Sequence, residues 1–329
     1  MTAMTWDKKR TLGRSGITVS AMGIGLWAIG GPWEYMGNPA GWGKVDDAES
    51  IRAVEAAVDM GVTFLDTAAN YGAGHSEEIL ARALKGRRHE VLIASKFGNR
   101  IDPTRKAVSE YDDPASHVRE DCEASLRRLR TDVIDLYQFH VNDYDPEKAL
   151  AVREELENLV EAGKIRAYGW STDFPERAAV FAHGEHCAAV QAPMNVVNDN
   201  PDMITLSDRF DLAFICRGPL GMGFLTGKYD HTSTWPENDV RNTAWVREGF
   251  LIPILTHLPI IREILTADGR SPAQGALAWL WARSPRTIPI PGVRTVAQVR
   301  ENVRALEKGP LDRSRMREIE RLLGRDTSA

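Results

Sequence analysis

Four side chains that can take up or release a proton stand just after short apolar stretches of the chain: Asp66, Tyr71, Lys96 and His140. Apolar stretches of this length are typical of buried strands. If those strands are parallel and neighbouring, their carboxyl ends meet on one face, and the four side chains converge there. A carboxylate, a phenol, an ammonium group and an imidazole in one cleft can perform general acid–base catalysis.

The four groups have complementary roles in such a site. A phenol is a poor proton donor near neutrality because its unperturbed pKa is about 10. We expect the ammonium group of Lys96 to stabilise the phenolate of Tyr71 and to lower its pKa. Asp66 is expected to pair with Lys96 and hold it, while His140 orients a substrate carbonyl. The pattern predicts Asp66, Tyr71, Lys96 and His140 as catalytic residues, with Tyr71 as the proton donor.

The elements that must position these residues alternate between strand and helix. Strands are predicted at 21–26, 62–66, 91–96, 133–139, 165–170, 188–192, 212–216 and 287–290, and helices at 46–60, 76–85, 114–129, 146–162, 175–182, 201–207, 272–283 and 295–306. This alternation predicts an α/β protein, a closed (β/α)8 TIM barrel. A hairpin at 11–20 precedes the barrel and an extra helix at 311–323 follows it. No linker divides the chain, so we predict a single barrel domain over residues 1–329.

Three long segments depart from a minimal barrel: residues 29–45, 98–113 and 224–249. Each follows a strand, so each is expected at the catalytic mouth, where long loops are often functional. Aromatic side chains on or near the first two suggest an apolar wall. The predicted substrate pocket consists of Trp27, Trp33, Tyr71, Phe97 and His140, which suits aldehydes or ketones of moderate apolarity.

Composition narrows the class of protein. A net charge of −5 and a pI near 6.0 argue against a nucleic-acid or anionic-membrane partner. The three cysteines lack the spacing of a zinc site or a disulfide framework, which favours a reducing compartment. Residues 1–10 are polar, and no uninterrupted apolar run approaches the ~20 residues of a membrane span. We therefore expect a cytoplasmic protein. The sequence leaves the oligomeric state open, and the charged outer helices fit a monomer.

Three motifs carry a resemblance to a known family. The segments FLDTAANYGAGHSE at 64–77, ASKFG at 94–98 and LYQFH at 136–140 resemble, in order and spacing, the signatures of the aldo-keto reductases. The resemblance extends over residues 12–306. It implies that Asp66, Tyr71, Lys96 and His140 form a catalytic tetrad in an oxidoreductase. Such an enzyme uses NADP(H) to reduce an aldehyde or ketone to an alcohol.

The cofactor is expected along the last strands of the barrel. No Gly-x-Gly-x-x-Gly motif opens a helix after the first strand, so a Rossmann site is not supported. The segment 288–295 instead leads into a helix whose face can hydrogen-bond an adenine, and Arg294 can meet a phosphate at the helix start. The resemblance implies that the adenosine and the 2′-phosphate of NADP lie on this motif, and the guanidinium of Arg294 there favours NADPH over NADH. Together with the resemblance, this predicts the cofactor-binding residues Ser171, Thr172, Gln191, Arg217, Pro219, Leu220, Gly221, Gly223, Lys228, Gly292, Arg294, Gln298, Glu301 and Asn302.

Two of these positions depart from the family pattern. Thr172 stands where the family has asparagine beside the nicotinamide amide, and Asp173 adds a carboxylate that this contact does not need. Arg217 stands where many members place a tyrosine that stacks on the nicotinamide. A planar guanidinium can also stack on a ring. It sits poorly beside the positive charge of the oxidised nicotinamide, so we expect Arg217 to favour release of NADP⁺.

Other classes of function stay open at this stage. A non-catalytic NADP(H)-sensing regulatory subunit would keep the cofactor site without turnover. A glycosidase would need paired carboxylates, such as Asp66 with Asp173 or Glu77. A metal enzyme is disfavoured, because His183 and His186 lack a carboxylate partner at ligand spacing.

Overall fold

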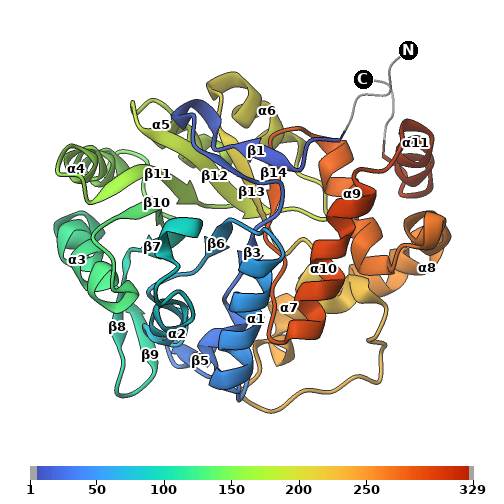
Figure 1. Ribbon diagram of the computed structural model, residues 1–329, viewed down its shortest axis with the longest axis horizontal. Helices are drawn as coiled ribbons and strands as arrows, with labels where there is room; N and C mark the ends of the chain where they lie inside the picture. Colours follow the sequence, from blue (N-terminus) through green and yellow to red (C-terminus); the bar gives the residue numbers. More distant parts are fainter. Residues whose placement is uncertain (1–5, 326–329) are drawn as a thin grey trace.

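A parallel sheet of eight strands forms the centre of the computed structural model, which describes residues 6–325 (Figure 1). Its strands, in spatial order, are β14 (Thr287–Pro289), β13 (Ala213–Arg217), β12 (Cys187–Pro193), β11 (Ile165–Ser171), β10 (Ile134–Phe139), β7 (Leu92–Phe97), β6 (Phe64–Asp66) and β3 (Ile24–Gly25). The backbone N–H of Gly23 donates to Pro289 over 3.0 Å, and that of Gly25 donates to Pro291 over 3.0 Å, which closes the sheet. The predicted barrel and its eight strands are confirmed.

Helices cover the outside of this barrel (Figure 1). They are α1 (Asp47–Asp59), α2 (His75–Ala83), α3 (Val118–Leu129), α4 (Ala149–Glu161), α5 (Pro175–Ala182), α6 (Pro201–Phe210), α9 (Pro272–Arg283) and α10 (Val296–Lys308). Side-chain caps mark the starts of α1, α6, α9 and α10. The carboxylate of Asp46 accepts hydrogen bonds from the N–H groups of Ala48 and Glu49, and Thr295 with Gln298 forms a capping box at α10.

A hairpin of β1 (Lys9–Thr11) and β2 (Thr18–Ser20) precedes the first barrel strand, as predicted. Its apolar residues Leu12 and Val19 are fully or almost fully buried. They pack in one cluster with inward-facing barrel residues, among them Ala94 and Leu136. The hairpin therefore belongs to the barrel core.

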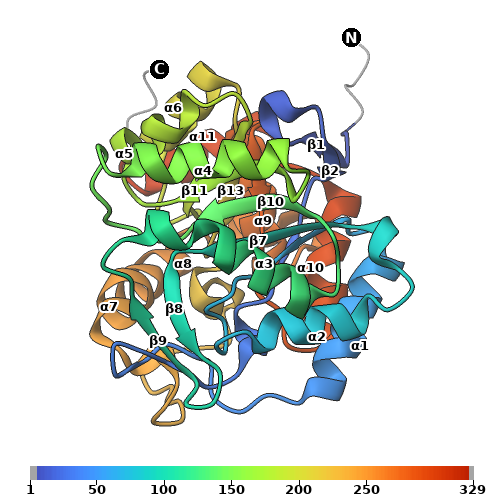
Figure 2. The same cartoon turned by 90° about the vertical axis from the view of Figure 1, so that its left-hand side faces the viewer.

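Two of the three long segments pair with each other. Residues 98–113, predicted as a loop, contain the antiparallel strands β8 (Asn99–Asp102) and β9 (Ala107–Glu110). Strand β9 also pairs with β4 (Glu34–Tyr35), which pairs with β5 (Asn38–Pro39). Figure 2 shows β8 and β9 projecting away from the barrel. The sequence reasoning missed this small sheet.

The connection between β13 and α9 contains further helices that the sequence did not predict. The helical run Ala244–Gly269 includes α7 (Ala244–Val246), the π-helix η7 (Arg247–Leu251) and α8 (Ile252–Thr266). By length and composition alone it is long and apolar enough to cross a membrane. In this fold, however, one side of α8 buries Ile254, Leu258, Ile261 and Leu265 in the protein core. A core helix passes the same test.

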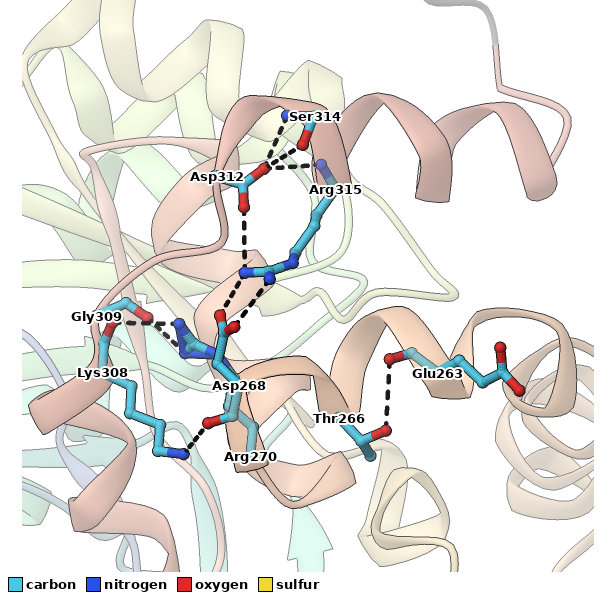
Figure 3. A network of polar contacts seen from close by, with 9 residues as sticks. All are labelled: Glu263, Thr266, Asp268, Arg270, Lys308, Gly309, Asp312, Ser314 and Arg315. Carbon is cyan, nitrogen blue, oxygen red and sulfur yellow. Dashed lines mark hydrogen bonds and ion pairs between the residues drawn. The ribbon is translucent and has the colours of Figure 1, made fainter.

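Helix α11 (Arg313–Leu322) lies outside the barrel, against α8 and α9, and confirms the predicted extra helix. Figure 3 shows the polar contacts at its start. Arg315 pairs with Asp268, and Arg270 donates to the carbonyl oxygens of Lys308 and Gly309 over 3.2 Å each. Ile319 on α11 is fully buried.

Candidate active site

The four predicted catalytic residues converge at the carboxyl end of the barrel. The ammonium nitrogen Nζ of Lys96 lies 2.5 Å from Oδ1 of Asp66 and 3.1 Å from the hydroxyl oxygen of Tyr71. It also donates to the carbonyl oxygen of Thr67 over 2.8 Å. Lys96 is completely buried. These three contacts give each proton of its ammonium group an acceptor. The ring of His140 meets that of Tyr71 edge-on, with centroids 6.0 Å apart.

Asp66 is held by two amides in addition to Lys96. Nε2 of Gln191 donates to Oδ2 of Asp66 over 2.9 Å, and Nε2 of Gln138 donates to the same oxygen over 3.3 Å. Gln138 is completely buried within β10, beside Lys96 in the strand register. The sequence reasoning did not single it out, although a polar residue in an otherwise apolar run was the available signal.

Burial dominates the protonation behaviour of Tyr71. Burial raises the pKa of Tyr71 above its ordinary value, and Asp66 adds to this, whereas Lys96 acts in the opposite direction. The predicted effect of Lys96 thus has the right sign, but the predicted net lowering of the pKa of Tyr71 is wrong. Burial alone lowers the pKa of Lys96, but Asp66 and Tyr71 together outweigh it and raise that pKa. The site therefore favours a protonated phenol beside a lysine cation.

His140 is neutral in this environment. Burial lowers the pKa of His140 well below its usual value, and the positive charges of Lys96 and Arg217 lower it further. Its backbone N–H donates to Phe97 over 2.8 Å, which fixes it at the end of β10. A neutral imidazole can donate one hydrogen bond without competing with Tyr71 as an acid.

A cavity of about 1400 Å³ joins this site to the start of α10. Most of the predicted residues line it. From the catalytic and substrate sets these are Asp66, Tyr71, His140, Trp27 and Trp33, and from the cofactor set Ser171, Gln191, Arg217, Pro219, Leu220, Gly223, Lys228, Gly292, Arg294, Gln298, Glu301 and Asn302. Lys96 lies beneath the wall. One continuous space thus connects both predicted sites.

Besides Lys96, three predicted residues do not line this cavity: Phe97, Thr172 and Gly221. Phe97 follows Lys96 in a strand and therefore points to the opposite face, where it stacks on Tyr137 with centroids 4.5 Å apart. Its assignment to the substrate pocket is wrong. The hydroxyl of Thr172 is completely buried and donates to the carbonyl oxygen of Asn142 over 2.8 Å, which leaves it a structural role.

The α10 end of the cavity is organised by intramolecular contacts. Oε1 of Gln298 accepts from the backbone N–H of Arg294 over 2.7 Å. The guanidinium of Arg294 donates to the carbonyl oxygens of Trp42, over 3.3 Å, and Lys44. The first long segment is thereby tied to α10. Burial lowers the pKa of Arg294, and the nearby charge of Arg241 contributes.

Arg241 is a cavity residue that the sequence reasoning missed. Its guanidinium donates to both carboxylate oxygens of Asp239, over 2.8 and 2.6 Å, and to the hydroxyl of Tyr229 over 2.8 Å. It also faces the rings of Trp42 and Trp235 at 5.0 and 5.2 Å. No motif marked it. Its partners Asp239, Tyr229 and Trp235 lie within 12 positions of it, and Trp42 comes from the first long segment.

Two further aromatic residues of the cavity wall, Trp245 and Phe250, were also missed. Their rings meet edge-on with centroids 5.7 Å apart. They lie on the helical run that the sequence reasoning took for an irregular loop. The segment 224–249, which holds Trp245, was expected at the catalytic mouth, but its helical form was not predicted.

The carboxylates considered for a glycosidase are already paired with other side chains of the protein. Glu77 is completely buried and accepts from Ser95 over 2.5 Å and from Arg128 over 2.7 Å. Asp173 pairs with Arg217. Over residues 6–325, no group of three or more histidine, cysteine, aspartate or glutamate side chains is arranged to hold a metal ion.

The fold and site define a (β/α)8-barrel protein with a buried, hydrogen-bonded Asp–Lys–Tyr cluster at the carboxyl ends of its strands. The family model described as "Aldo/keto reductase family" matches residues 21–323, and the chain belongs to that family. The predicted family and fold are confirmed.

Individual relatives agree with this assignment. The chain is 32% identical over 303 residues to aldo-keto reductase yakc of Schizosaccharomyces pombe, whose name specifies NADP(+), with 88% of this chain and 84% of that protein covered. Among solved structures, a glycerol dehydrogenase of Gluconobacter oxydans is similar with a TM-score of 0.82 and 29% identity, over 98% of this chain and 97% of that one. An aldo/keto reductase of Klebsiella pneumoniae, solved with NADP and acetate, has a TM-score of 0.72 and 26% identity over the same shares.

Proposed function

We propose that this protein is an NADPH-dependent oxidoreductase that reduces an aldehyde or ketone to an alcohol, with Tyr71 as the proton donor. The hydrogen bond of 3.1 Å between Lys96 and Tyr71, beside a cavity that continues to α10, carries this proposal. The NADP named for the yeast and Klebsiella relatives supports the choice of cofactor.

The residues of the cavity fit a dinucleotide cofactor. The space runs from the buried amide of Gln191 to Asn302 on α10, which is also buried. Ser171 and Gln191 would hold the nicotinamide amide, the segment from Pro219 to Lys228 the pyrophosphate, and the start of α10 the adenosine. Arg294, with Arg241 near it, would supply the positive charge that favours a 2′-phosphate, and thus NADPH.

Bound NADPH would supply the hydride. The side chains of the protein would orient the carbonyl group and protonate its oxygen. Tyr71 donates its proton there, and the cation of Lys96, held by Asp66, stabilises the phenolate that remains. A neutral His140 orients the carbonyl by a hydrogen bond. Trp27, whose ring stacks on Tyr71 with centroids 6.1 Å apart, keeps water away from the phenol.

The first test is a fluorescence titration of the purified protein with NADPH and with NADH, followed by addition of 4-nitrobenzaldehyde at saturating cofactor. We expect tighter binding of NADPH and consumption of the cofactor on addition of the aldehyde. Binding without turnover on any carbonyl would favour a regulatory, NADP(H)-sensing role. If neither cofactor binds, the proposed function is wrong.

We further propose a small-molecule substrate, a cytoplasmic location and a monomeric state. The net charge of −5 supports the absence of a nucleic-acid or membrane partner. Light scattering of the purified protein tests the monomer, and a stable dimer would contradict it.

A further inference from the structure

An ion pair joins the end of β13 to the segment that follows β11, on either side of β12. Nη2 of Arg217, at the end of β13, donates to Oδ1 of Asp173, which follows β11 by two residues. Strand β12 lies between β11 and β13, and its residue Gln191 pairs with Ser171 in the strand register. The pair therefore bridges the part of the barrel where Ser171 and Gln191 stand.

The charge of Arg217 acts on the catalytic groups. Arg217 lines the same cavity as Tyr71 and His140. Its positive charge contributes to the lowered pKa of His140 and opposes the raised pKa of Tyr71, although burial is the larger cause in both cases. A change in the net charge at Arg217 will therefore change the electrostatic potential at Tyr71 and His140.

Charge balance gives Asp173 a role. The nicotinamide of NADP⁺ carries one positive charge that NADPH lacks. Another cation of the site, Lys96, is already paired with Asp66. An unpaired guanidinium at Arg217 would disfavour the oxidised ring, whereas the Arg217–Asp173 pair is neutral as a whole.

We propose that Asp173 is a positioning residue that holds and neutralises Arg217, so that this ion pair sets the relative affinity of the enzyme for NADP⁺ and NADPH. This inference rests on the proposed function, because it assumes that the nicotinamide lies beside Ser171 and Gln191. It replaces the expectation that Arg217 alone favours release of NADP⁺.

The inference predicts opposite effects from the two partners. In Asp173→Asn, Arg217 keeps its charge without a partner, and the dissociation constant of NADP⁺ is expected to rise about tenfold while that of NADPH changes little. In Arg217→Gln, Asp173 is left alone beside the ring, and NADP⁺ is expected to bind more tightly relative to NADPH. The double variant is expected to return near the original ratio. A tenfold change in this ratio corresponds to about 30 mV in the potential of the bound two-electron couple.

The experiment is a fluorescence or calorimetric titration of each variant with NADP⁺ and with NADPH, in low salt. Asp173 and Arg217 have side chains 42% and 33% exposed, so their exchange is not expected to unfold the protein. Asp59→Asn is the matched control, because it also removes a carboxylate paired with an arginine, Arg87, but away from the cavity. It should leave the ratio unchanged.

Shifts of the ratio in opposite directions, cancelling in the double variant, support the inference. Equal changes for both cofactors, or an unchanged ratio, would overturn it while leaving the proposed function intact. If the unaltered protein binds neither cofactor, the proposed function and this inference both fail.

Discussion

At the scale of single residues, the two buried charges of the site, Lys96 and Asp66, are paired with each other. Lys96 is completely buried, and a lone cation there would be very costly. The carboxylate of Asp66 offsets that cost, and Gln138 and Gln191 satisfy the second carboxylate oxygen. Tyr71 then receives a hydrogen bond from a lysine that has little freedom to move away.

The first prediction concerns the proton donor. Tyr71→Phe removes only the hydroxyl, so carbonyl reduction should slow by about 10²–10⁴-fold while NADPH binding stays almost unchanged. Steady-state kinetics and a cofactor titration measure the two effects. Tyr137→Phe is the matched control, because Tyr137 is completely buried but lies outside the cavity. A Tyr71→Phe variant that keeps most of its kcat would contradict the assignment.

The second prediction concerns pH. Because the pKa of Tyr71 is raised, its phenol stays protonated up to and beyond about pH 10, the ordinary pKa of a phenol. Because the pKa of His140 is lowered, its imidazole stays neutral even when the pH falls to about 6.5, the ordinary pKa of histidine. Neither group should therefore titrate between about pH 6 and pH 9. The single-turnover rate of reduction at saturating NADPH is expected to be flat over that range. A step within it that disappears in His140→Gln would show that His140 titrates there.

The convergence of Asp66, Tyr71, Lys96 and His140 could be predicted because each follows an apolar run, and strand ends in a parallel barrel meet on one face. The side chains that contact them could not be predicted in the same way. Gln138 lies inside a strand, and Asp173 meets Arg217 across an intervening strand and 44 positions of sequence. Phe97 was misplaced because the alternation of side chains along β7 sends it to the face opposite Lys96.

At the scale of elements, the turn that carries Tyr71 is supported by the first long segment. Gly30 ends the short helix η2 (Ala28–Gly30) and packs directly on the backbone of this turn. A Cβ atom on Gly30 would lie 2.8 Å from the carbonyl carbon of Tyr71 and 2.9 Å from the nitrogen of Gly72. Both contacts are with backbone atoms, so a flexible side chain cannot relieve them.

The third prediction follows from this contact. Gly30→Ala should displace the Tyr71 turn and lower kcat/KM by more than about tenfold, because small misplacements of a catalytic group are costly. Steady-state kinetics measure the loss. Gly249→Ala is the control, since no atom lies within 4 Å of a Cβ at that position. If both variants retain full activity, the backbone contact does not position Tyr71.

Strands and helices could be predicted where the pattern of apolar residues was strong. The eight barrel strands are short runs buried on nearly all sides, and the helices α1, α6, α9 and α10 begin at side-chain caps. Helix α8 was missed because it contains Pro253 and Pro259, and proline inside a pattern usually argues against a helix. Pro253 directly follows the π-helix η7 within the same helical run. Strands β8 and β9 were missed because their partly exposed residues carry little apolar pattern.

At the scale of the whole molecule, both described ends of the chain are fastened to the barrel by apolar contacts. The ring of Trp6 packs against Trp281 with centroids 5.2 Å apart, and Trp281 donates to the carbonyl oxygen of Ala21 over 2.8 Å. At the other end, α11 buries Ile319 against the outer helices. The polar contacts of Figure 3 lie at the start of this helix.

The fourth prediction separates these two kinds of contact. Ile319→Ala removes a completely buried side chain and should lower the free energy of unfolding by about 2–4 kcal/mol. Arg315→Ala breaks the ion pair with Asp268, whose side chain is 55% exposed, and should cost no more than about 1 kcal/mol. Urea unfolding followed by circular dichroism measures both. The loss in Arg315→Ala should also shrink at high salt, because exposed charges are screened, whereas the loss in Ile319→Ala should not. A larger loss from Arg315→Ala would mean that the polar network, and not the apolar face of α11, holds this helix to the barrel.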